Sequence, residues 1–412
     1  MKFDTLKGMK DTYFDDMAKY EYIINTAKEV FSKYSYDRVM TPILEETNLF
    51  KRAVGDETDV VSKEMYTFID KGDRSVTLRP EGTAGVVRAY LNAGFHKSNP
   101  NVKWYYYGPM YRYEAPQKGR YREFHQVGIE SLGIRTPLID AEIIKMACEF
   151  LGKLGINDLV VEVNSLGNID SRFRYIEELK KYLKDNFDGL SNDSKIRSDK
   201  NPLRVLDSKD ENDQKILLNA PMLHDFFDEE SNKYFEDLKY YLEKFEINYV
   251  VNQKLVRGLD YYSDTVFEVK SSKLGAQSTV LAGGRYDRLT EILADVKIPG
   301  IGFAAGIERL SLLIDDELIK KENKKIFVIY FEETKDYFIN TLNTLRKHNI
   351  NVEFEYAPKG FGTQMKKANK IDAKYVLILG EDEMKNNKIS VKNFEDGSQE
   401  ILTIDEVIER IK

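Results

Sequence analysis

The sequence is poor in cysteine, since Cys148 is the only one among 412 residues. A single thiol excludes an internal disulfide. The four histidines are scattered and lack the spacing of zinc ligands: they are His96, His125, His224 and His348. We therefore expect no metal site built from protein side chains, and a buried, unreactive Cys148 within the apolar run IIKMACEFL.

The sequence also lacks long apolar runs. The longest notable one is YVLIL at 375–379, whereas a membrane-spanning helix needs about 20 apolar residues. The first residues, MKFDTLKGMKDTYFDDM, contain no apolar core of a secretory signal. These observations predict a cytoplasmic protein with no membrane partner. The net charge of −7 argues against non-specific nucleic-acid binding but permits a local basic face.

The composition is that of a globular protein with more than one domain. Hydrophobic residues make up 42% and charged residues 32% of the chain, as in typical folded domains. A chain of 412 residues is too long for one ordinary core, so we expect two or three domains. The stretch at about 170–250 is charged, helical in pattern and poor in glycine after Gly189. This pattern indicates an inserted helical module with mostly solvated charges.

The most informative stretch is 104–133, WYYYGPMYRYEAPQKGRYREFHQVGIESLG. Its aromatic and β-branched residues predict two strands, and Pro116 and Gly119 interrupt the charged loop between them. Side chains alternate between faces along a strand. Each strand therefore places one set of residues on a common face: Met110, Arg112 and Glu114 on the first, and Phe124, Gln126, Gly128, Glu130 and Leu132 on the second.

If these two faces point the same way, they gather polar groups around a hollow at Gly128. The planar fork of Arg112 suits a phosphate group. The ring of Phe124 could stack on a nucleobase, and Gln126 with Glu130 could hold an ammonium group. The alternative is an ordinary hairpin with a polar outer face, which leaves this mixture of groups beside a glycine unexplained.

A second candidate segment, Arg79-Pro80-Glu81-Gly82-Thr83, joins the predicted strand SVTLR to the predicted helix AGVVRAYLNAG. Glu81 and Thr83 stand at the start of that helix. Residues of these types often serve there only as helix caps. Capping and substrate binding are equally supported by the local pattern.

The run KLVRGLDYYSDTVFEV at 254–269 predicts two extended segments around Ser263-Asp264. On the first segment, strand alternation places Arg257, Leu259 and Tyr261 on one face, opposite Gly258, Asp260 and Tyr262. A purely structural core strand is the alternative. Downstream, the paired glycines of AGGRYD at 282–287 allow close backbone approach to a ligand, and Tyr286 could line its pocket.

The segment PGIGFAAGIERLSLLI at 299–314 predicts a glycine-rich strand that leads into a helix carrying Glu308 and Arg309. Its glycine spacing is G-x-G-x-x-x-G, without a long preceding apolar strand or a βαβ partner. We therefore reject a dinucleotide-binding Rossmann motif.

Taken together, these runs resemble the histidyl-tRNA synthetase family of class II aminoacyl-tRNA synthetases. The stretch 104–133 is similar to motif 2, the segment 299–314 to motif 3, and the helix predicted at 16–34 with the strand ending at Pro42 to motif 1. The R-P-E-G-T, R-G-L-D-Y-Y and A-G-G-R-Y-D runs resemble signatures of the histidine-specific members. The resemblance covers essentially the full length, in the family order.

The resemblance implies an α+β fold with an antiparallel sheet flanked by helices. It implies a catalytic domain at 1–320, interrupted by the helical insertion, and a C-terminal anticodon-binding-like domain at 326–412. The strand and helix patterns of the C-terminal part independently predict a small α/β domain with a mostly parallel sheet. The lysine-rich run DDELIKKENKK at 315–325 is the expected linker.

The implied activity is that of a histidine–tRNA ligase. The carboxylate of L-histidine attacks the α-phosphorus of ATP to give histidyl-adenylate, and the histidyl group then passes to the 3′ end of tRNA(His). Mg²⁺ would bridge the ATP phosphates. The resemblance also implies a homodimer formed through motif 1, and the insertion could contact the acceptor arm of the tRNA.

The family roles transfer to residues of this sequence in four sets. The implied catalytic residues are Arg112, Arg257 and Arg309. The implied ATP-binding residues are Arg112, Glu114, Phe124 and Arg309. The implied histidine-binding residues are Glu81, Thr83, Gln126, Glu130, Tyr261, Tyr262 and Tyr286. The residues implied to meet the tRNA acceptor end are Gln117, Lys118 and Arg120.

One departure affects that last set. Ala115 and Tyr113 stand where the family often has arginine and histidine, so the sequence leaves open how the first base pair of the tRNA is recognised.

Two alternatives of other classes remain. The first is a non-catalytic paralogue that senses histidine as the regulatory subunit of ATP phosphoribosyltransferase. Such paralogues lose catalytic arginines and usually the C-terminal domain, whereas this sequence contains Arg112, Arg257, Arg309 and a C-terminal α/β pattern. The second is a nucleic-acid-binding accessory protein on a degenerate scaffold, which should have lost the R-G-L-D-Y-Y run.

Overall fold

The computed structural model of this chain describes residues 3–55, 58–206, 208–256, 259, 261–275, 278–319 and 325–411. Arg257, one of the predicted catalytic residues, lies outside the described residues. The chain divides into two compact units, Met1–Ile319 and Lys320–Lys412. Each unit is described by itself.

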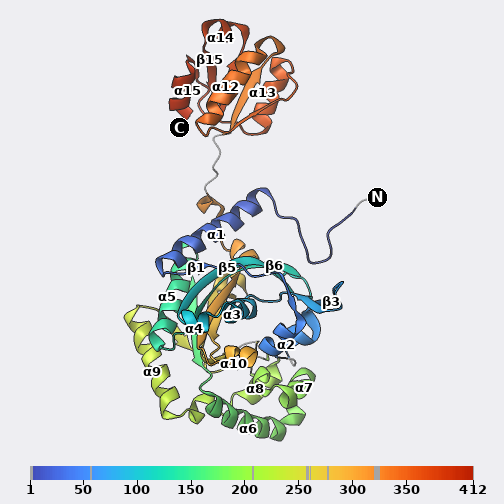
Figure 1. The fold of residues 1–412 in the computed structure, drawn as a ribbon, viewed down its shortest axis with the longest axis vertical. Helices are drawn as coiled ribbons and strands as arrows, with labels where there is room; N and C mark the ends of the chain where they lie inside the picture. The colour runs from blue at the N-terminus through green and yellow to red at the C-terminus, as the bar shows by residue number, and fades with distance from the viewer. Residues whose placement is uncertain are drawn as a thin grey trace. The chain divides into compact units, whose positions relative to one another are not determined.

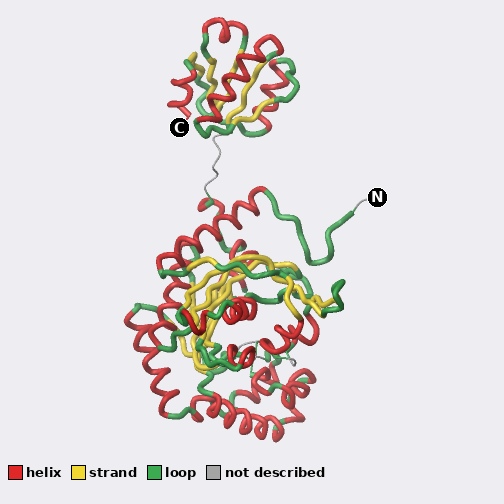
Figure 2. The backbone as a smooth tube through the Cα atoms, viewed as in Figure 1, coloured by secondary structure: helices red, strands yellow, loops and turns green. Residues whose placement is uncertain are grey.

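An eight-stranded sheet forms the frame of the first unit, in the order β1-β5-β6-β11-β10-β9-β7-β8 (Figure 2). Its strands are β1 (Asp37–Arg38), β5 (Val102–Tyr111), β6 (Glu123–Leu132), β7 (Leu159–Ser165), β8 (Tyr249–Val251), β9 (Ser263–Ser271), β10 (Thr279–Arg285) and β11 (Gly300–Gly306). Neighbours from β5 to β7 are antiparallel. The short edge strands β1 and β8 pair in parallel. The predicted antiparallel sheet is confirmed.

Three long helices cover one face of this sheet: α1 (Phe14–Lys33), α5 (Pro137–Lys153) and α9 (Glu229–Lys244) (Figure 1). Their apolar side chains share a core with strand residues such as Val127 and Ile129. Because side chains alternate along β6, Gln126, Gly128 and Glu130 point to the opposite face. The alternation predicted for this strand therefore separates core residues from candidate site residues.

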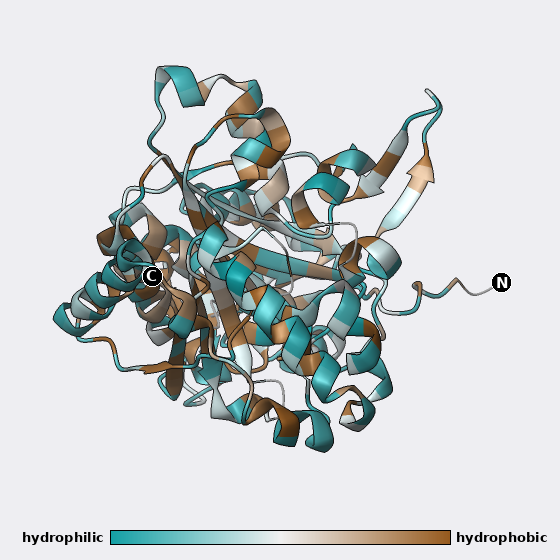
Figure 3. Ribbon diagram, turned by 90° about the horizontal axis from the view of Figure 1, so that it is seen from below, coloured by the Kyte–Doolittle hydropathy of each residue, from teal (hydrophilic) through white to brown (hydrophobic). Residues whose placement is uncertain are grey.

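Local sequence explains where these helices begin. The side chain of Thr136 accepts the backbone N–H of Ile139 at 3.3 Å, and Pro137 occupies the first turn of α5. Asp15 and Asp16 lie in the first turn of α1, where carboxylates interact favourably with the helix dipole. The helices carry both hydrophilic and hydrophobic residues, coloured teal and brown in Figure 3.

A three-stranded sheet in the order β2-β4-β3 leads into the helices of the opposite face. Its strands are β2 (Leu44–Glu46), β3 (Tyr66–Ile69) and β4 (Ser75–Leu78). The helices nearby are α2 (Thr47–Val54), α3 (Thr83–Asn92), α4 (Phe95–Ser98) and α10 (Leu289–Ala294). In contrast, α11 (Ile307–Ser311) packs in the same core as α1. The segment Arg79–Gly82 thus connects a strand to a helix, as predicted.

The stretch predicted as an insertion at about 170–250 is helical, and its parts differ in what they pack against. Helices α6 (Ile169–Asp185), α7 (Asn192–Lys200) and α8 (Glu211–Leu217) lie together (Figure 1). The apolar residues of α6 and α8 belong to a second core, shared with α2 and α3. In contrast, α9 packs in the core beneath the main sheet. Strand β8 extends that sheet at its edge.

The strand predicted for the R-G-L-D-Y-Y run is wrong for its described residues. Strand β9 begins only at Ser263, and Leu255, Val256, Leu259, Tyr261 and Tyr262 lie outside strands. Tyr261 and Tyr262 are both buried, rather than on alternating faces. Asp264, the second residue of β9, has a positive φ of 43° and lies where the pairing of β9 with β10 is irregular, so the strand is not regular at its start.

The second unit is a three-layer α/β fold around a five-stranded sheet in the order β13-β12-β14-β15-β16. Its strands are β12 (Ile326–Tyr330), β13 (Val352–Phe354), β14 (Tyr375–Leu379), β15 (Ile389–Asn393) and β16 (Gln399–Leu402). Its helices are α12 (Lys335–Lys347), α13 (Phe361–Lys370), α14 (Glu381–Asn386) and α15 (Ile404–Ile411). Helices α12 and α15 pack on one face of the sheet, and α13 packs on the other.

The prediction of a mostly parallel sheet in this unit is corrected. Strands β13, β12 and β14 are parallel, but β15 and β16 are antiparallel to their neighbours. Parallel neighbours need a crossover of about a dozen residues or more, and only the segment 394–398 joins β15 to β16. Among the described helices of both units, none combines the length and apolar content of a membrane span.

Candidate active site

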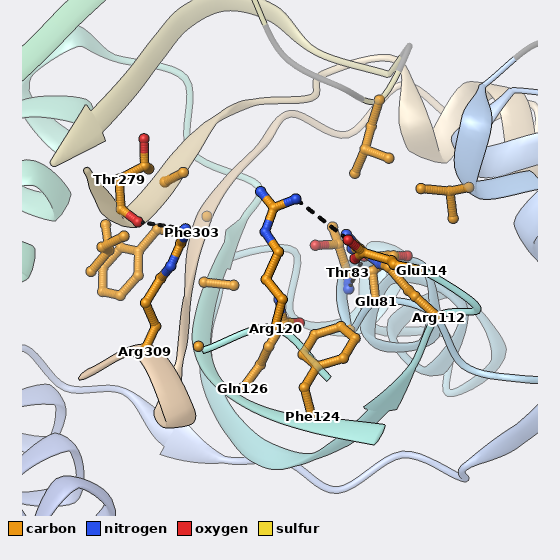
Figure 4. A pocket seen from close by; sticks show the side chains of 18 of the residues that line it. Glu81, Thr83, Arg112, Glu114, Arg120, Phe124, Gln126, Thr279, Phe303 and Arg309 are labelled. Carbon is orange, nitrogen blue, oxygen red and sulfur yellow. Dashed lines mark hydrogen bonds and ion pairs between the residues drawn. The ribbon is translucent and has the colours of Figure 1, made fainter. Parts of the chain in front are cut away.

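A cavity of about 430 Å³ lies over β6, β10 and β11 in the first unit. Its walls include the start of α3, the loop after β5 and the start of α11. A cavity of this size can hold a small molecule or a nucleotide. Figure 4 shows side chains from these separate segments converging on it.

Most of the predicted site residues meet in this cavity. Those that line it are Glu81, Thr83, Arg112, Glu114, Arg120, Phe124, Gln126, Tyr261, Tyr262, Tyr286 and Arg309. Glu130 lies directly behind the wall and accepts hydrogen bonds from Thr83 and Tyr286. Gln117 and Lys118 are exposed and do not line the cavity. Of the three residues that the sequence grouped, only Arg120 lines the cavity, although its backbone is paired with that of Gln117.

The register of the β5–β6 pair confirms the shared face only as far as Met110, because β5 ends at Tyr111 and leaves Arg112 and Glu114 in the loop after it. Met110 stands opposite Phe124, and Tyr106 stands opposite Gly128. The hollow expected at Gly128 is filled, however. A Cβ atom at Gly128 would lie 2.6 Å from the Tyr106 ring. Glycine is needed here because a large neighbour crosses its position, and Tyr106 becomes a wall residue that the sequence analysis missed.

Arg112 is held against the segment that begins α3. Its Nε donates to the carbonyl oxygen of Pro80 at 2.8 Å, and its guanidinium carbon lies 5.4 Å from the centre of the Phe124 ring. Arg112, the candidate phosphate-binding group, thus lies near Phe124, the candidate base-stacking ring, and is anchored to the residue before Glu81.

Glu81 performs the capping role that the sequence left as an alternative. Its carboxylate accepts the backbone N–H groups of Thr83 at 2.6 Å and Ala84 at 2.8 Å. Burial raises the pKa of Glu81, although these two donors act in the opposite direction. The carboxylate also lines the cavity. Capping and substrate binding are therefore compatible at this position.

Glu130 is the most deeply buried carboxyl group of the site, with 1% of its surface exposed. It accepts hydrogen bonds from Thr83 Oγ1 at 2.8 Å, Tyr286 Oη at 2.5 Å and Tyr106 Oη at 3.3 Å. Burial raises the pKa of Glu130 to about 8, even though these donors favour its ionised form. Near neutral pH, this carboxyl group can hold or release a proton at the wall of the cavity.

Three tyrosines form an aromatic wall beside Glu130. The rings of Tyr261 and Tyr262 are 4.7 Å apart, and those of Tyr261 and Tyr286 are 5.8 Å apart. All three are buried, which raises the pKa of the Tyr261 and Tyr286 hydroxyl groups well above their usual value. These hydroxyl groups remain protonated and can act as hydrogen-bond donors.

Arginines line the other end of the cavity. Arg309 donates to the carbonyl oxygen of Thr279 at 2.9 Å, and Arg120 pairs with Glu114 at 3.4 Å. Figure 4 shows Arg120 between Arg309 and Glu114. Burial and the positive charge of Arg120 lower the pKa of Arg309. This concentration of guanidinium groups suits a polyanion such as a triphosphate.

Glu308, which had no role predicted from the sequence, lies in the wall of the cavity. Its carboxylate accepts the backbone N–H of His125 at 2.8 Å and contacts His125 Nδ1 at 3.0 Å. It therefore ties the start of α11 to β6, between Phe124 and Gln126. No spacing rule could have found this contact, because the two residues are 183 positions apart.

Two further features bear on ligands. Among the described residues, Oε1 of Gln126 is a buried acceptor without a hydrogen-bond partner, which suits a donor group on a ligand. No group of three or more metal-ligating side chains occurs in the described ranges. Burial and the nearby carboxylate of Glu114 raise the pKa of Glu64 in the cavity wall. This pair of carboxylates could support a cation that is held mainly by phosphate oxygens.

Comparisons with known proteins identify the family of this chain. Residues 8–310 match the family model of histidyl-tRNA synthetase, and residues 325–412 match that of an anticodon binding domain. The chain is 45% identical over 414 aligned positions to a histidine–tRNA ligase of Rickettsia bellii, covering 100% of this chain and 99% of the relative.

Among solved structures, the apo histidyl-tRNA synthetase of S. aureus matches with a TM-score of 0.83 and 36% identity over 100% of both chains. A Bacillus halodurans protein described as an ATP phosphoribosyltransferase regulatory subunit/histidyl-tRNA synthetase matches with a TM-score of 0.66 at 20% identity, over 89% of this chain and 97% of that one. That second likeness shows the fold alone. The full-length ligase relatives make the regulatory-subunit alternative less favoured. The chain belongs to the histidyl-tRNA synthetase family of ATP-dependent aminoacyl-tRNA ligases.

Proposed function

We propose that this chain uses the cavity of the first unit to activate L-histidine with ATP and then transfers the histidyl group to the 3′ end of tRNA(His). The observation that supports this most strongly is the shared cavity itself. It joins Arg112, Arg120 and Arg309 to an aromatic and carboxyl-lined end near Glu130. A triphosphate and an amino acid need these two kinds of surface side by side.

In the activation step, a carboxylate oxygen of histidine attacks the α-phosphorus of ATP, and pyrophosphate leaves. Such a displacement depends on positioning and charge stabilisation rather than on covalent help from the protein. Arg112 stabilises the charge that develops on the α-phosphate, and Arg257 joins it by resemblance to the family. Arg309 holds the β- and γ-phosphates at the other end.

The remaining ATP contacts come from the hairpin. Phe124 stacks on the adenine, and its proximity to Arg112 at 5.4 Å supports this arrangement. Mg²⁺ would supply charge neutralisation between the phosphate groups. Glu114 and Glu64 are the side chains that would assist in holding it.

Histidine occupies the opposite end of the cavity. Its charged α-groups are bound by Glu81, Thr83, Gln126 and Glu130, and the buried unpartnered oxygen of Gln126 supports such a role. Its imidazole ring lies among Tyr261, Tyr262 and Tyr286.

In the transfer step, the tRNA acceptor end meets the loop after β5, through Gln117, Lys118 and Arg120. Because Arg120 also lines the cavity, it can contact the acceptor end only where that end enters the site. The second unit binds the anticodon, in keeping with its family match. We expect these reactions to take place in the cytoplasm.

A homodimer is part of the same proposal. Met40, Ile43 and Leu44 are exposed in the segment that resembles motif 1, and exposed apolar clusters often mark interfaces. Light scattering of the purified chain should give twice the mass of one chain. The mass of a single chain would exclude the dimer.

Two assays test the proposed function. Wild-type protein should charge a tRNA bearing the histidine anticodon, and it should exchange pyrophosphate into ATP only with histidine present. Arg257→Ala should lower this exchange by roughly 10²–10³-fold, the scale of losing one preorganised donor. A drop below about threefold would remove Arg257 from the catalytic set, and no charging by the wild type would refute the function.

A further inference from the structure

The insertion helices share one hydrophobic core with the aromatic end of the cavity. Tyr261, Tyr262 and Tyr286 belong to the same buried cluster as Tyr175 and Leu179 of α6. The segment after α7 contributes Leu203, Val205 and Leu206 to that cluster. The insertion therefore packs directly behind the tyrosine wall, although its charged sequence suggested only a solvated module.

A direct polar contact accompanies this packing. Arg172, in the first turn of α6, donates from Nη1 to the carbonyl oxygen of Tyr262 at 2.8 Å. A charge-assisted hydrogen bond of this kind is stronger and more directional than a neutral one. Because Tyr262 lies outside any strand, its backbone is not fixed by a sheet ladder. The guanidinium of Arg172 supplies part of the missing support.

A second hydrogen-bonded path leads from the insertion to the same loop. His224, which follows α8, contacts Asn164 Oδ1 through Nε2 at 2.9 Å. The amide nitrogen of Asn164 donates to the carbonyl oxygen of Leu255 at 3.0 Å. Arg204 of the insertion lines the main cavity together with Leu259 and Tyr261. Arg172 thus contacts the loop directly, and His224 reaches it through Asn164.

We propose that the insertion positions the tyrosine wall for amino-acid activation, with Arg172 as the positioning residue that acts through Tyr262. This inference rests on the proposed function, because it assumes that the wall binds histidine. A module that only bound tRNA would not need a hydrogen bond to the backbone of Tyr262. The insertion is then required for histidine activation even before any tRNA binds.

The test is histidine-dependent pyrophosphate exchange with the full chain and no tRNA. Arg172→Ala should raise the KM for histidine by roughly tenfold, the scale of one lost charge-assisted hydrogen bond. The KM for ATP should change by less than about twofold, since the arginine-lined end is unaffected. Arg172→Lys, which keeps the charge and the stem, should recover part of the loss.

Arg174 provides a matched control. It lies on the same helix and also donates to a main-chain carbonyl at 2.8 Å, but its acceptor is Phe226 within the insertion. Arg174→Ala should leave the KM for histidine within about twofold of the wild type. Equal values for Arg172→Ala and Arg174→Ala, or an equal rise in both KM values for Arg172→Ala, would overturn the inference.

Failure of the proposed function and failure of the positioning role give different results. If the wild type shows no histidine-dependent exchange, the proposed function fails. If the wild type is active and Arg172→Ala behaves like it, only the positioning role fails. Melting temperatures of all variants identify misfolding, and if Arg172→Ala does not fold, Arg172→Lys is judged by the same KM criterion.

Discussion

At the scale of single residues, the protonation of Glu130 makes the stability of the folded chain depend on pH. Its pKa of about 8 in the folded chain lies above the value of about 4.3 expected for an unfolded glutamate. The folded state therefore holds a proton that the unfolded state has released. The stability that this provides is complete below about pH 4.3 and is lost as the pH rises through the folded-state pKa.

We predict that the free energy of unfolding of the wild type falls relative to that of Glu130→Gln between pH 5 and pH 8. The slope should reach at most about 1.4 kcal/mol per pH unit, the limit for one proton. Denaturant titrations at several pH values measure it. Parallel pH profiles for the two proteins would show that Glu130 is ionised throughout. Glu81, whose pKa is also raised, is present in both proteins, so the difference between their free energies of unfolding mainly reports on Glu130.

Arg112 allows a second prediction at this scale. Arg112→Lys keeps a positive charge but loses the planar fork and the bond from Nε to Pro80. Pyrophosphate exchange should fall by roughly 10²-fold, since one preorganised donor at the reacting phosphate is lost. Arg38→Lys is the control, because its guanidinium packs on Tyr107 outside the cavity. Unchanged exchange in Arg112→Lys would contradict contact with the α-phosphate.

At the scale of elements, β11 needs a glycine at position 302 because groups of β6 lie close to its backbone. A Cβ atom at Gly302 would lie 2.0 Å from a carboxylate oxygen of Glu130 and 2.3 Å from the carbonyl oxygen of Ile129. We predict that Gly302→Ala destabilises the chain by about 1–3 kcal/mol through overpacking and abolishes most histidine-dependent exchange. Gly306→Ala in the same strand meets only an ordinary contact at 3.8 Å. Equal thermal stability of the two variants would refute the steric argument.

The end of β10 is held by a buried ionic cluster. Arg285 is fully buried, lies 3.3 Å from Asp140 on α5 and 3.1 Å from Asp287, and donates to the hydroxyl group of Tyr234 on α9. These contacts fix both neighbours of Tyr286. The A-G-G-R-Y-D run is recognisable in the sequence, but the partners of Arg285 are not. Through its buried contacts, Arg285 joins β10 to the helices α5 and α9.

We predict that Arg285→Ala lowers the free energy of unfolding by about 3–5 kcal/mol, because removing one partner leaves buried charges uncompensated. Arg288→Ala, which removes an exposed partner of Glu291, should cost less than about 1 kcal/mol. Urea denaturation of both variants checks this. A similar cost for the two would mean that the buried cluster contributes little.

At the scale of the whole molecule, the two units have separate cores. The cavity and its described residues lie entirely in the first unit, while the second unit packs around its own five-stranded sheet. A chain ending at Ile319 should therefore fold and retain histidine-dependent exchange within about tenfold, because domains with their own cores fold independently. Charging of tRNA should fall by much more. Loss of both activities in a folded fragment would contradict this division of labour.

The sequence alone determined the features that depend on local pattern. Strand alternation predicted that Phe124, Gln126 and Glu130 share a face, and the sequence predicted the helix α1. Glycine and proline marked the turns and the strand-to-helix junction at Glu81. These signals are local because backbone geometry repeats over a few residues.

Only the tertiary structure decided which distant groups meet. Tyr106 fills the space over Gly128, Tyr261 and Tyr262 lie outside strands, and Arg172 reaches Tyr262 from 90 positions away. Arg120 reaches the cavity although its backbone is paired with that of the exposed Gln117. Such outcomes depend on packing between elements, which no periodicity encodes, because the same local pattern is compatible with many partners.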